Sequence, residues 1–489
     1  MRHLFDKLEA YGRSDIYPCH MPGHKREALG KLPPALAGID VTEIEGFDNL
    51  HHPEGILLEL QQRAARLCGA EESFYLVNGS TGGILSAVSA ALPRGVRILM
   101  ARNCHMSAYH AAYLRGLKVT YLYPELLEEY DIYEAVTGDQ IRLALEREPD
   151  IGAVLIVSPT YEGRIADVAS IARIVHDRGI PLIVDEAHGA HLGLNRRVHE
   201  NSCQAGADLA IQSVHKTLPA LTQAALLHVN GRLIDRGVLR RFLRIYQSSS
   251  PSYLLMASID SALDYVESCG EEAYAAFERQ YREMLKNLRK CRHLRFLPED
   301  LERQDLGKLV ISVKNTAITG GQLYDTLLKS YRIQTEMAAE SYVLAMFTLG
   351  DRPEGYARME QALLEIDGKL GKDSGEDSES GGVFCIRLER FLGREEEPSS
   401  AVPLGIAWDE EKELTLLSEC AGRYAGEFIS LYPPGIPLAV PGERLTEEMV
   451  RDVSRWLEEG LNVQGLERRG GEDFVWTLRE KSGRRHPEA

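Results

Sequence analysis

Apolar residues between about positions 56 and 214 alternate between helical and strand spacing. Residues 56–67 place apolar side chains three and four positions apart, and Gly69 then offers a left-handed helix end. The apolar runs 153–157 and 180–184 are strand-sized, and a helical stripe at residues 168–175 separates them. Repeated units of this kind predict an α/β domain whose mainly parallel sheet is covered on both faces.

The pattern changes past residue 300. Alternating apolar positions at 309, 311 and 313, a helix near 322–329 and a strand near 343–347 predict a smaller α+β domain. Residues 372–382 contain four carboxylates and no apolar side chain, which is typical of a flexible linker. An amphipathic helix at 446–459 then indicates a further α+β domain. The predicted units are an N-terminal segment (1–40), a large domain (41–300), a small domain (301–371), the acidic linker (372–382) and a C-terminal domain (383–489).

Composition narrows the class of protein. The 489 residues are 44% hydrophobic and carry a formal net charge of −17, so nucleic acid is an unfavourable partner and a small basic substrate is favoured. No window approaches the roughly 18 consecutive apolar residues of a membrane span, and the first twenty residues lack an apolar signal core. We therefore expect a cytoplasmic protein. The eight cysteines are widely spaced, which predicts reduced thiols and no cysteine zinc site.

Ligands of parallel α/β sheets bind beyond the carboxyl ends of the strands, and small or polar residues follow several predicted strands. The run VNGSTGG at residues 77–83 lies between an apolar run and a helix predicted to start near Ile84. Backbone N–H groups there, with the hydroxyls of Ser80 and Thr81, suit a phosphate. A plain tight turn is an equally good interpretation of this run alone.

The run DEAHGAH at residues 185–191 directly follows another predicted strand. A carboxylate fixed there, Asp185, can keep a heteroaromatic ring nitrogen protonated and so make that ring an electron acceptor. The alternatives are simple strand-end polarity or a metal site that uses His188 and His191, with His215 joining them in space. No third ligand follows at a familiar spacing, so we expect no metal.

Lys216 ends a strand-like run 31 residues after Asp185 and follows Ser213 and His215. A lysine amine whose pKa is lowered by burial forms Schiff bases with aldehydes, although a lysine at a strand end is usually a solvated charge. A phosphate site, a carboxylate and a lysine together are the parts of a pyridoxal phosphate site. His105, just before a helix predicted at 106–115, could then lie flat against the cofactor ring.

These residues resemble the Orn/Lys/Arg decarboxylases, pyridoxal phosphate enzymes of the aspartate aminotransferase fold type I. The similarity extends through most of the chain. It is carried by MPGHK (21–25), NGST (78–81), RNCH (102–105), SPTY (158–161), VDEAHGAH (184–191), SVHK (213–216), YPPGIP (432–437) and PGE (441–443). The resemblance implies a seven-stranded large domain followed by the smaller α+β and C-terminal domains.

The resemblance also implies roles for individual residues. Lys216 would hold the cofactor covalently, Asp185 would pair with its ring nitrogen and His105 would stack on the ring. His215 would help to deliver protons, and His188 would lie near the phenolic oxygen of the cofactor or the substrate carboxylate. The phosphate would be bound by Ser80, Thr81 and Ser213. Met106 stands where many members have lysine, which puts one secondary contact to the ring or the phosphate in doubt.

The implied reaction is decarboxylation of a basic amino acid, with arginine favoured slightly over lysine and then ornithine. Candidates to meet the distal cation of the substrate are Glu336, Glu340 and Glu443, although each of these carboxylates is individually more typical of a structural role. We expect a homodimer or a larger assembly of dimers, of the short type without an N-terminal wing domain. The alternatives are an aminotransferase or lyase of the same fold, a non-catalytic regulatory homologue, and a metal hydrolase that uses His188, His191 and His215.

Overall fold

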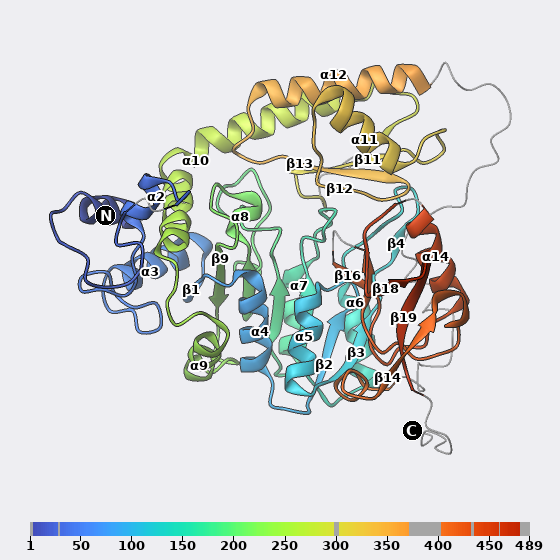
Figure 1. Ribbon diagram of the computed structural model, residues 1–489, viewed down its shortest axis with the longest axis horizontal. Coiled ribbons are helices and arrows are strands. Elements are labelled where there is room, and N and C mark those ends of the chain that lie inside the picture. Colours follow the sequence, from blue (N-terminus) through green and yellow to red (C-terminus); the bar gives the residue numbers. More distant parts are fainter. Residues whose placement is uncertain are drawn as a thin grey trace.

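The computed structural model describes residues 3–27, 30–297, 303–370, 402–431, 435–458 and 460–479. Its largest sheet has seven strands in the order β1-β9-β8-β7-β6-β2-β3 (Figure 1). Only β9 runs antiparallel to its neighbours, so the predicted mainly parallel sheet is confirmed. The strands are β1 Glu72–Leu76, β2 Arg97–Ala101, β3 Lys118–Leu122, β6 Ile151–Val157, β7 Leu182–Asp185, β8 Leu209–Gln212 and β9 Ala225–Val229.

Helices cover both faces of this sheet. One hydrophobic core packs α4, α5, α6, α7 and α9 against the strands, and a second joins α1, α3 and the first half of α10 (Tyr253–Leu288) to β1 and β9. The helices are α1 Leu4–Gly12, α2 Pro34–Ile39, α3 Ile56–Cys68, α4 Gly79–Ala91, α5 Met106–Arg115, α6 Gly138–Arg147, α7 Val168–His176, α8 Val214–Thr217 and α9 Arg236–Tyr246. Two of them end as predicted, because Gly69 and Gly116 adopt the left-handed conformation (φ 70° and 58°).

Helix α4 begins at Gly79, so the prediction of a helix starting near Ile84 was wrong. The five residues Gly-Ser-Thr-Gly-Gly have low helix propensity, but tertiary packing overrides it. A Cβ atom on Gly83 would lie 2.6 Å from Cδ1 of Leu76 and 2.8 Å from Cγ2 of Ile211. Glycine therefore lets the first turn of α4 approach the sheet closely, and Ser80 and Thr81 lie within that turn.

The small domain is a four-stranded antiparallel sheet, in the order β10-β11-β13-β12, with helices α11 and α12. The long helix α10 (Tyr253–Leu288) extends from the large domain into the small one, and its last turns belong to the small-domain core (Figure 1). That core therefore starts before the predicted boundary at 301. The remaining elements are β10 Arg295–Leu297, β11 Lys308–Ser312, α11 Gly320–Tyr331, β12 Met337–Ala338, β13 Tyr342–Met346 and α12 Pro353–Leu370. A hairpin of β4 Leu126–Leu127 and β5 Ile132–Tyr133 packs beneath this sheet.

The C-terminal domain has two three-stranded sheets, β14-β19-β18 and β16-β15-β17, beside helix α14. The predicted helix at 446–459 is α14, Glu447–Glu458. The other elements of the C-terminal domain are α13 Leu404–Ala407, β14 Lys412–Leu416, the 3₁₀ helix η2 Leu417–Glu419, β15 Ile429–Leu431, β16 Ile436–Ala439, β17 Val463–Gln464, β18 Leu466–Arg469 and β19 Glu472–Leu478. The predicted linker at 372–382 and residues 432–434 of the YPPGIP motif lie outside the described residues.

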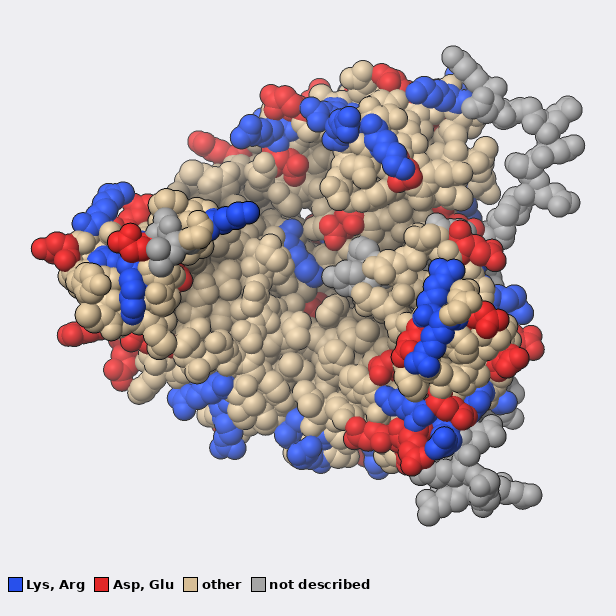
Figure 2. Space-filling model, in the orientation of Figure 1, with Lys and Arg blue, Asp and Glu red and all other residues tan. Residues whose placement is uncertain are grey.

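The three domains meet around a recess on the face shown in Figure 2. The large domain forms its floor, the small domain lies above it and the C-terminal domain borders it on one side (Figures 1 and 2). Within the described ranges, no helix has both the length and the apolarity needed to span a bilayer.

Candidate active site

Two neighbouring strands of the large sheet position the central residues of the site. Asp185 is the last residue of β7, and β8 leads through Ser213 into the short helix α8, which carries His215 and Lys216. Because β7 and β8 are parallel and paired, their carboxyl ends lie side by side. The fold therefore brings together residues that are about thirty positions apart in the sequence.

The amine of Lys216 lies 3.0 Å from Nε2 of His188, and Nδ1 of the same imidazole lies 2.8 Å from the amine of Lys308. One histidine thus bridges two lysines that come from different domains. Lys216 is half-buried, whereas Lys308 is only 1% exposed. Burial lowers the pKa of Lys216, and it lowers the pKa of Lys308 to about 8.

Asp185 is almost fully buried, and one of its oxygens accepts a hydrogen bond of 3.1 Å from the N–H of Ala187. Burial raises the pKa of Asp185, while the nearby charge of Lys216 and the Ala187 N–H partly oppose that rise. A buried carboxylate of this kind binds a cation or a protonated ring nitrogen strongly, because little water competes for it.

The first turn of α4 suits a phosphate. The side chain of its N-cap residue, Asn78, makes no capping hydrogen bond, so it accepts no hydrogen bond from the N–H groups of this turn. Ser80 is half-buried and Thr81 is exposed. The hydroxyl of Ser213 is buried and has no hydrogen-bond partner among the described residues. It is therefore suited to form a hydrogen bond with a bound ligand.

His105 caps α5: its Nδ1 accepts a hydrogen bond from the N–H of Ser107 (3.2 Å). The residue is exposed, so its ring offers a free surface for stacking. The surrounding protein, followed by the charge of Lys216, lowers the pKa of His105. His215 pairs through Nδ1 with the carbonyl of Ala224 at 2.9 Å, and burial lowers its pKa.

The three candidate glutamates lie in different surroundings. Glu336 is exposed, accepts a hydrogen bond of 2.6 Å from the hydroxyl of Tyr161, and raises the pKa of Lys216. Glu443 instead pairs with the buried Arg102 at 3.0 Å. Glu340 lies 3.7 Å from Arg455 of the C-terminal domain. Of the three, Glu336 is the one whose charge acts on Lys216.

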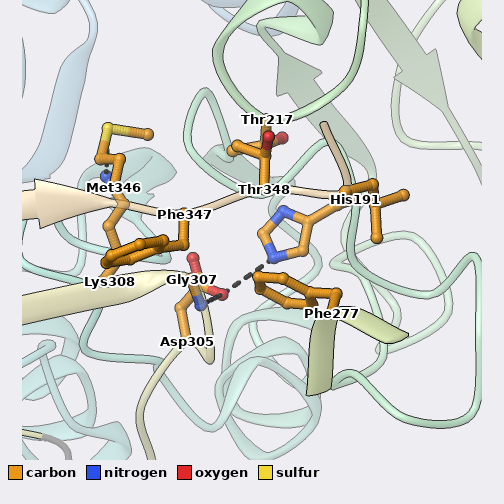
Figure 3. Close-up of a pocket in the computed structure, with 10 residues that line it drawn as sticks. His191, Thr217, Phe277, Asp305, Gly307, Lys308, Met346, Phe347 and Thr348 are labelled. Atoms are coloured by element: carbon orange, nitrogen blue, oxygen red, sulfur yellow. Dashed lines mark hydrogen bonds and ion pairs between the residues drawn. The ribbon is translucent and has the colours of Figure 1, made fainter. Parts of the chain in front are cut away.

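The histidines proposed for a metal hydrolase face different partners. His188 faces the two lysines, His215 faces a carbonyl, and His191 forms an ion pair of 2.8 Å with the buried Asp305. In the part of the chain that the structure describes, no group of three or more His, Cys, Asp or Glu side chains is placed to hold a metal ion. The ion pair of His191 and Asp305 lines a small pocket together with Lys308 (Figure 3).

Lys308 and Tyr161 were not assigned a role from the sequence. Tyr161 lies in the SPTY motif, packs edge-on against His188 with ring centroids 4.9 Å apart, and has the Lys308 amine 5.3 Å from its ring centroid. The signal for Lys308 in the sequence is a lysine that opens a strand with three consecutive apolar residues, KLVIS. A lysine at a strand end is usually solvated, so that signal is weak.

Comparison with known proteins places this site in a family. The model of the "Orn/Lys/Arg decarboxylase, major domain" matches residues 3–317, and that of the corresponding C-terminal domain matches residues 397–462. The chain belongs to the Orn/Lys/Arg decarboxylase family. It is 33% identical to the arginine decarboxylase of Bacillus subtilis (strain 168) over 479 residues, which is 95% of each chain. It is 32% identical to the arginine decarboxylase of Bacillus anthracis, over 95% of this chain and 94% of the relative.

A solved relative supports the fold. The constitutive lysine decarboxylase of Escherichia coli superposes with a TM-score of 0.79 at 20% sequence identity, covering 97% of this chain and 82% of the other. The aminotransferase-like fold expected from the sequence is thereby confirmed, and the family membership makes this protein a pyridoxal phosphate-dependent amino-acid decarboxylase. The free first turn of α4, the unpartnered hydroxyl of Ser213 and the buried Asp185 beside Lys216 fit that cofactor.

Proposed function

We propose that this Orn/Lys/Arg decarboxylase acts on arginine, releasing carbon dioxide and agmatine, with lysine as the next best substrate. Two relatives that are 33% and 32% identical to it are named arginine decarboxylases, whereas those named lysine decarboxylases are about 23% identical. Within the site, the observation that carries the proposal is the amine of Lys216 held 3.0 Å from His188 beside the buried Asp185.

We assign the recognition of the substrate cation to Glu336. Its carboxylate is exposed, and the hydroxyl of Tyr161 holds it in place at 2.6 Å. A carboxylate can accept two parallel hydrogen bonds from a guanidinium group, which favours arginine over the ammonium group of lysine. Glu443 is occupied by Arg102, and this makes it the weaker candidate.

Each catalytic residue has a proposed task. Asp185 would hold a proton on the ring nitrogen of the cofactor, and Lys216 would hold the cofactor and carry a proton at Nζ. His188 exchanges that proton through Nε2. His105 would help to orient the ring, while Ser213 and the first turn of α4, with Ser80 and Thr81, would bind the phosphate.

The bound pyridoxal phosphate supplies a protonated ring that accepts the electron pair left by the departing carboxylate. The protein contributes orientation and electrostatics. Asp185 can stabilise positive charge at the ring because burial removes competing water, and His215 beside Lys216 stays unprotonated near neutral pH because its pKa is lowered. The predicted homodimer and cytoplasmic location stay predictions.

The test is an assay of the purified protein with arginine, lysine and ornithine, measuring carbon dioxide and the amine product. We expect agmatine from arginine at the highest kcat/KM. The variant Lys216→Ala should lose both activity and the visible absorbance of the bound cofactor. A keto acid in place of carbon dioxide would indicate an aminotransferase, and a colourless wild-type protein that borohydride does not affect would refute the assignment of Lys216.

Substrate recognition has its own test. Glu336→Gln should raise KM for arginine at least tenfold and should lower kcat by a smaller factor. The contact between Glu336 and the substrate cation is made both in the bound substrate and in the transition state, so its loss weakens binding more than it slows the reaction. The matched control is Glu354→Gln, which changes an exposed glutamate in the first turn of α12. Equal KM values for the wild type and Glu336→Gln would remove Glu336 from the substrate site.

A further inference from the structure

One imidazole joins two lysine amines at the boundary between the large and small domains. Nε2 of His188 lies 3.0 Å from Nζ of Lys216, and Nδ1 of the same ring lies 2.8 Å from Nζ of Lys308. Lys308 opens strand β11, and neither the sequence motifs nor the family resemblance gives it a role. Figure 3 shows its side chain at the edge of the pocket, beside Met346 and Phe347. A buried amine costs free energy unless specific partners compensate for it, so this contact needs an explanation.

The bridge limits the number of protons that its three groups can hold. A neutral imidazole donates a hydrogen bond from one nitrogen and accepts one at the other. An ammonium group only donates, so two ammonium groups cannot both form a hydrogen bond with one neutral imidazole. Burial, followed by the neighbouring amines of Lys308 and Lys216, holds the pKa of His188 well below its usual range and keeps this imidazole neutral. The geometry therefore requires one ammonium group and one neutral amine.

Burial decides which of the two amines is neutral, because the loss of water disfavours the charged form of a lysine. Lys308 is 1% exposed, whereas Lys216 is half-buried. Burial lowers the pKa of Lys216, and it lowers the pKa of Lys308 to about 8 although the carboxylate of Asp305 opposes this change. From about pH 8 upward, Lys308 is therefore the neutral amine and Lys216 carries the proton.

Both contacts of the bridge are then hydrogen bonds with one donor and one acceptor. The Lys216 ammonium donates to Nε2 of His188, and the Nδ1–H of His188 donates to the lone pair of Lys308. A second arrangement satisfies the same two contacts with the charge on Lys308. Passing to it breaks the N–H bonds at Lys216 and at Nδ1 and forms N–H bonds at Nε2 and at Lys308. No proton has to enter or leave the protein.

The surroundings of Lys308 allow it to carry this charge. Burial acts to raise the pKa of Asp305, but the adjacent His191 outweighs it and lowers that pKa, so Asp305 is ionised and can stabilise a nearby ammonium group. The ring of Tyr161, with its centroid 5.3 Å from Nζ of Lys308, favours a cation in the same way. The other titratable groups that act on the two amines or the imidazole are Asp185, Glu162, Glu336, His105 and His215.

We propose that Lys308 is the proton acceptor at the end of this relay: through His188 it takes the proton that the Lys216 amine must lose before it can bond to carbon, and it returns that proton by the same route. The inference rests on the proposed function, in which the unprotonated amine of Lys216 is the nucleophile that binds the cofactor. Lys308 acts through the imidazole of His188, which never has to hold two protons at once.

The relay has a measurable consequence for the pH dependence of Lys216. While the three groups hold one transferable proton, the unprotonated fraction of Lys216 is set by the equilibrium between the two arrangements, and that equilibrium does not depend on pH. Without Lys308, the proton has to leave for the solvent. The unprotonated fraction below the pKa of Lys216 then changes about tenfold per pH unit.

The experiment measures the reactivity of the Lys216 amine in full-length protein freed of cofactor. Trace acetic anhydride acetylates unprotonated amines, and mass spectrometry of the peptide that contains Lys216 gives the rate at each pH. Between pH about 8 and about 9, the wild-type rate should rise no more than about threefold, whereas the rate in Lys308→Met should rise by close to tenfold. Equal slopes in the two proteins would overturn the proposal.

Three further variants separate proton transfer from charge and from structure. Lys308→Arg retains a positive charge but cannot accept a proton, so its profile should be as steep as that of Lys308→Met, and a shallow profile would overturn the proposal. Lys314→Met removes another lysine of the small domain, which pairs with Asp131 at 2.8 Å, and should keep the shallow profile. In a His188→Asn background the relay is already broken, so adding Lys308→Met should not steepen the profile; a further change would show that Lys308 acts independently of His188 and would overturn the proposal.

A measurement on the unaltered protein keeps the proposal testable should Lys308→Met fail to fold. At about pH 9 the ¹⁵N NMR shifts of His188, assigned by comparison with His188→Asn, should show the Nδ1–H tautomer, and a predominant Nε2–H tautomer would overturn the proposal. Failure of the proposed function is a different outcome: the shallow acetylation profile would persist, but wild-type protein would attach no pyridoxal phosphate at Lys216.

Discussion

The substitution Arg102→Met should loosen the attachment of the C-terminal domain to the large domain. Arg102 follows β2 and is fully buried. Its guanidinium donates to the carbonyls of Pro437 (2.7 Å) and Leu438 (3.1 Å) in β16, and to the carboxylate of Glu443 (3.0 Å). It also donates to the hydroxyl of Tyr109 in α5 at 3.0 Å. A single side chain thus satisfies acceptors on both sides of the domain boundary.

The magnitude follows from the burial of these groups. Removing one partner of a buried ion pair typically costs about 3–5 kcal/mol, because the remaining charge is left without compensation. The carboxylate of Glu443 is 14% exposed and regains some hydration, so we expect the lower end, about 3 kcal/mol. With a denaturant dependence of about 2 kcal/mol per molar urea, the midpoint for this domain should fall by about 1.5 M.

Tryptophan fluorescence can follow this domain selectively. All three tryptophans of the chain, Trp408, Trp456 and Trp476, belong to the C-terminal domain. Trp456 is fully buried, and Trp408 packs edge-on against Tyr113 of α5 with ring centroids 4.7 Å apart. Fluorescence in urea therefore reports both the unfolding of this domain and its separation from α5.

The control for Arg102→Met is Arg142→Met. Arg142 forms an exposed ion pair with Asp139, and its loss should change stability by no more than about 0.5 kcal/mol. Arg102→Lys should lower the midpoint by an intermediate amount. Lysine retains the charge but lacks the planar guanidinium group, which donates to several acceptors at once. A fluorescence midpoint in Arg102→Met equal to that of the wild type would refute the claim that Arg102 holds the two domains together.

Three further predictions concern the large domain. The charged contact of Asp185 should contribute roughly 3–4 kcal/mol at the transition state, so Asp185→Asn should lower kcat about 10²- to 10³-fold. The control is Asp177→Asn, which changes an exposed aspartate, and equal kcat values for the two variants would contradict the role of Asp185. Gly83→Ala should destabilise the protein by about 1–3 kcal/mol in thermal unfolding because the new Cβ meets Leu76 and Ile211, whereas Gly368→Ala, with open space in α12, should stabilise it by up to about 1 kcal/mol. Burial lowers the pKa of His228 to about 4 in the folded protein. As the pH falls from about 6.5 to about 4, His228 therefore binds a proton in the unfolded state before it does so in the folded state. The free energy of unfolding should drop by about 3 kcal/mol over this range. Urea titrations across that range should show a shallower pH dependence in His228→Asn; an equal dependence would exclude His228 as its source.

Local patterns in the sequence were enough for several features. The helix at Met106–Arg115 ends where Gly116 permits a left-handed residue, and the apolar runs before Asp185 and Ser213 became neighbouring parallel strands. Since the carboxyl ends of parallel strands share one edge of a sheet, strand prediction placed Asp185 and Lys216 at the same edge, and the pairing of β7 with β8 in the fold made them neighbours. The start of α4 was missed, because Gly79 and Gly83 have poor helix propensity and only close packing on the sheet makes the helix favourable there.

What the sequence by itself determined is therefore the large-domain architecture and the position of Asp185, Ser213 and Lys216 at the ends of its strands, because hydrophobic periodicity and the residues at a strand end are local properties of the chain. Only the tertiary structure decided that Lys308, 120 residues from His188, would share its imidazole with Lys216, and that Glu443 would pair with Arg102. The free energy of a buried charge depends on which partners the fold brings within a few ångströms of it, and one-dimensional spacing carries no information about those partners.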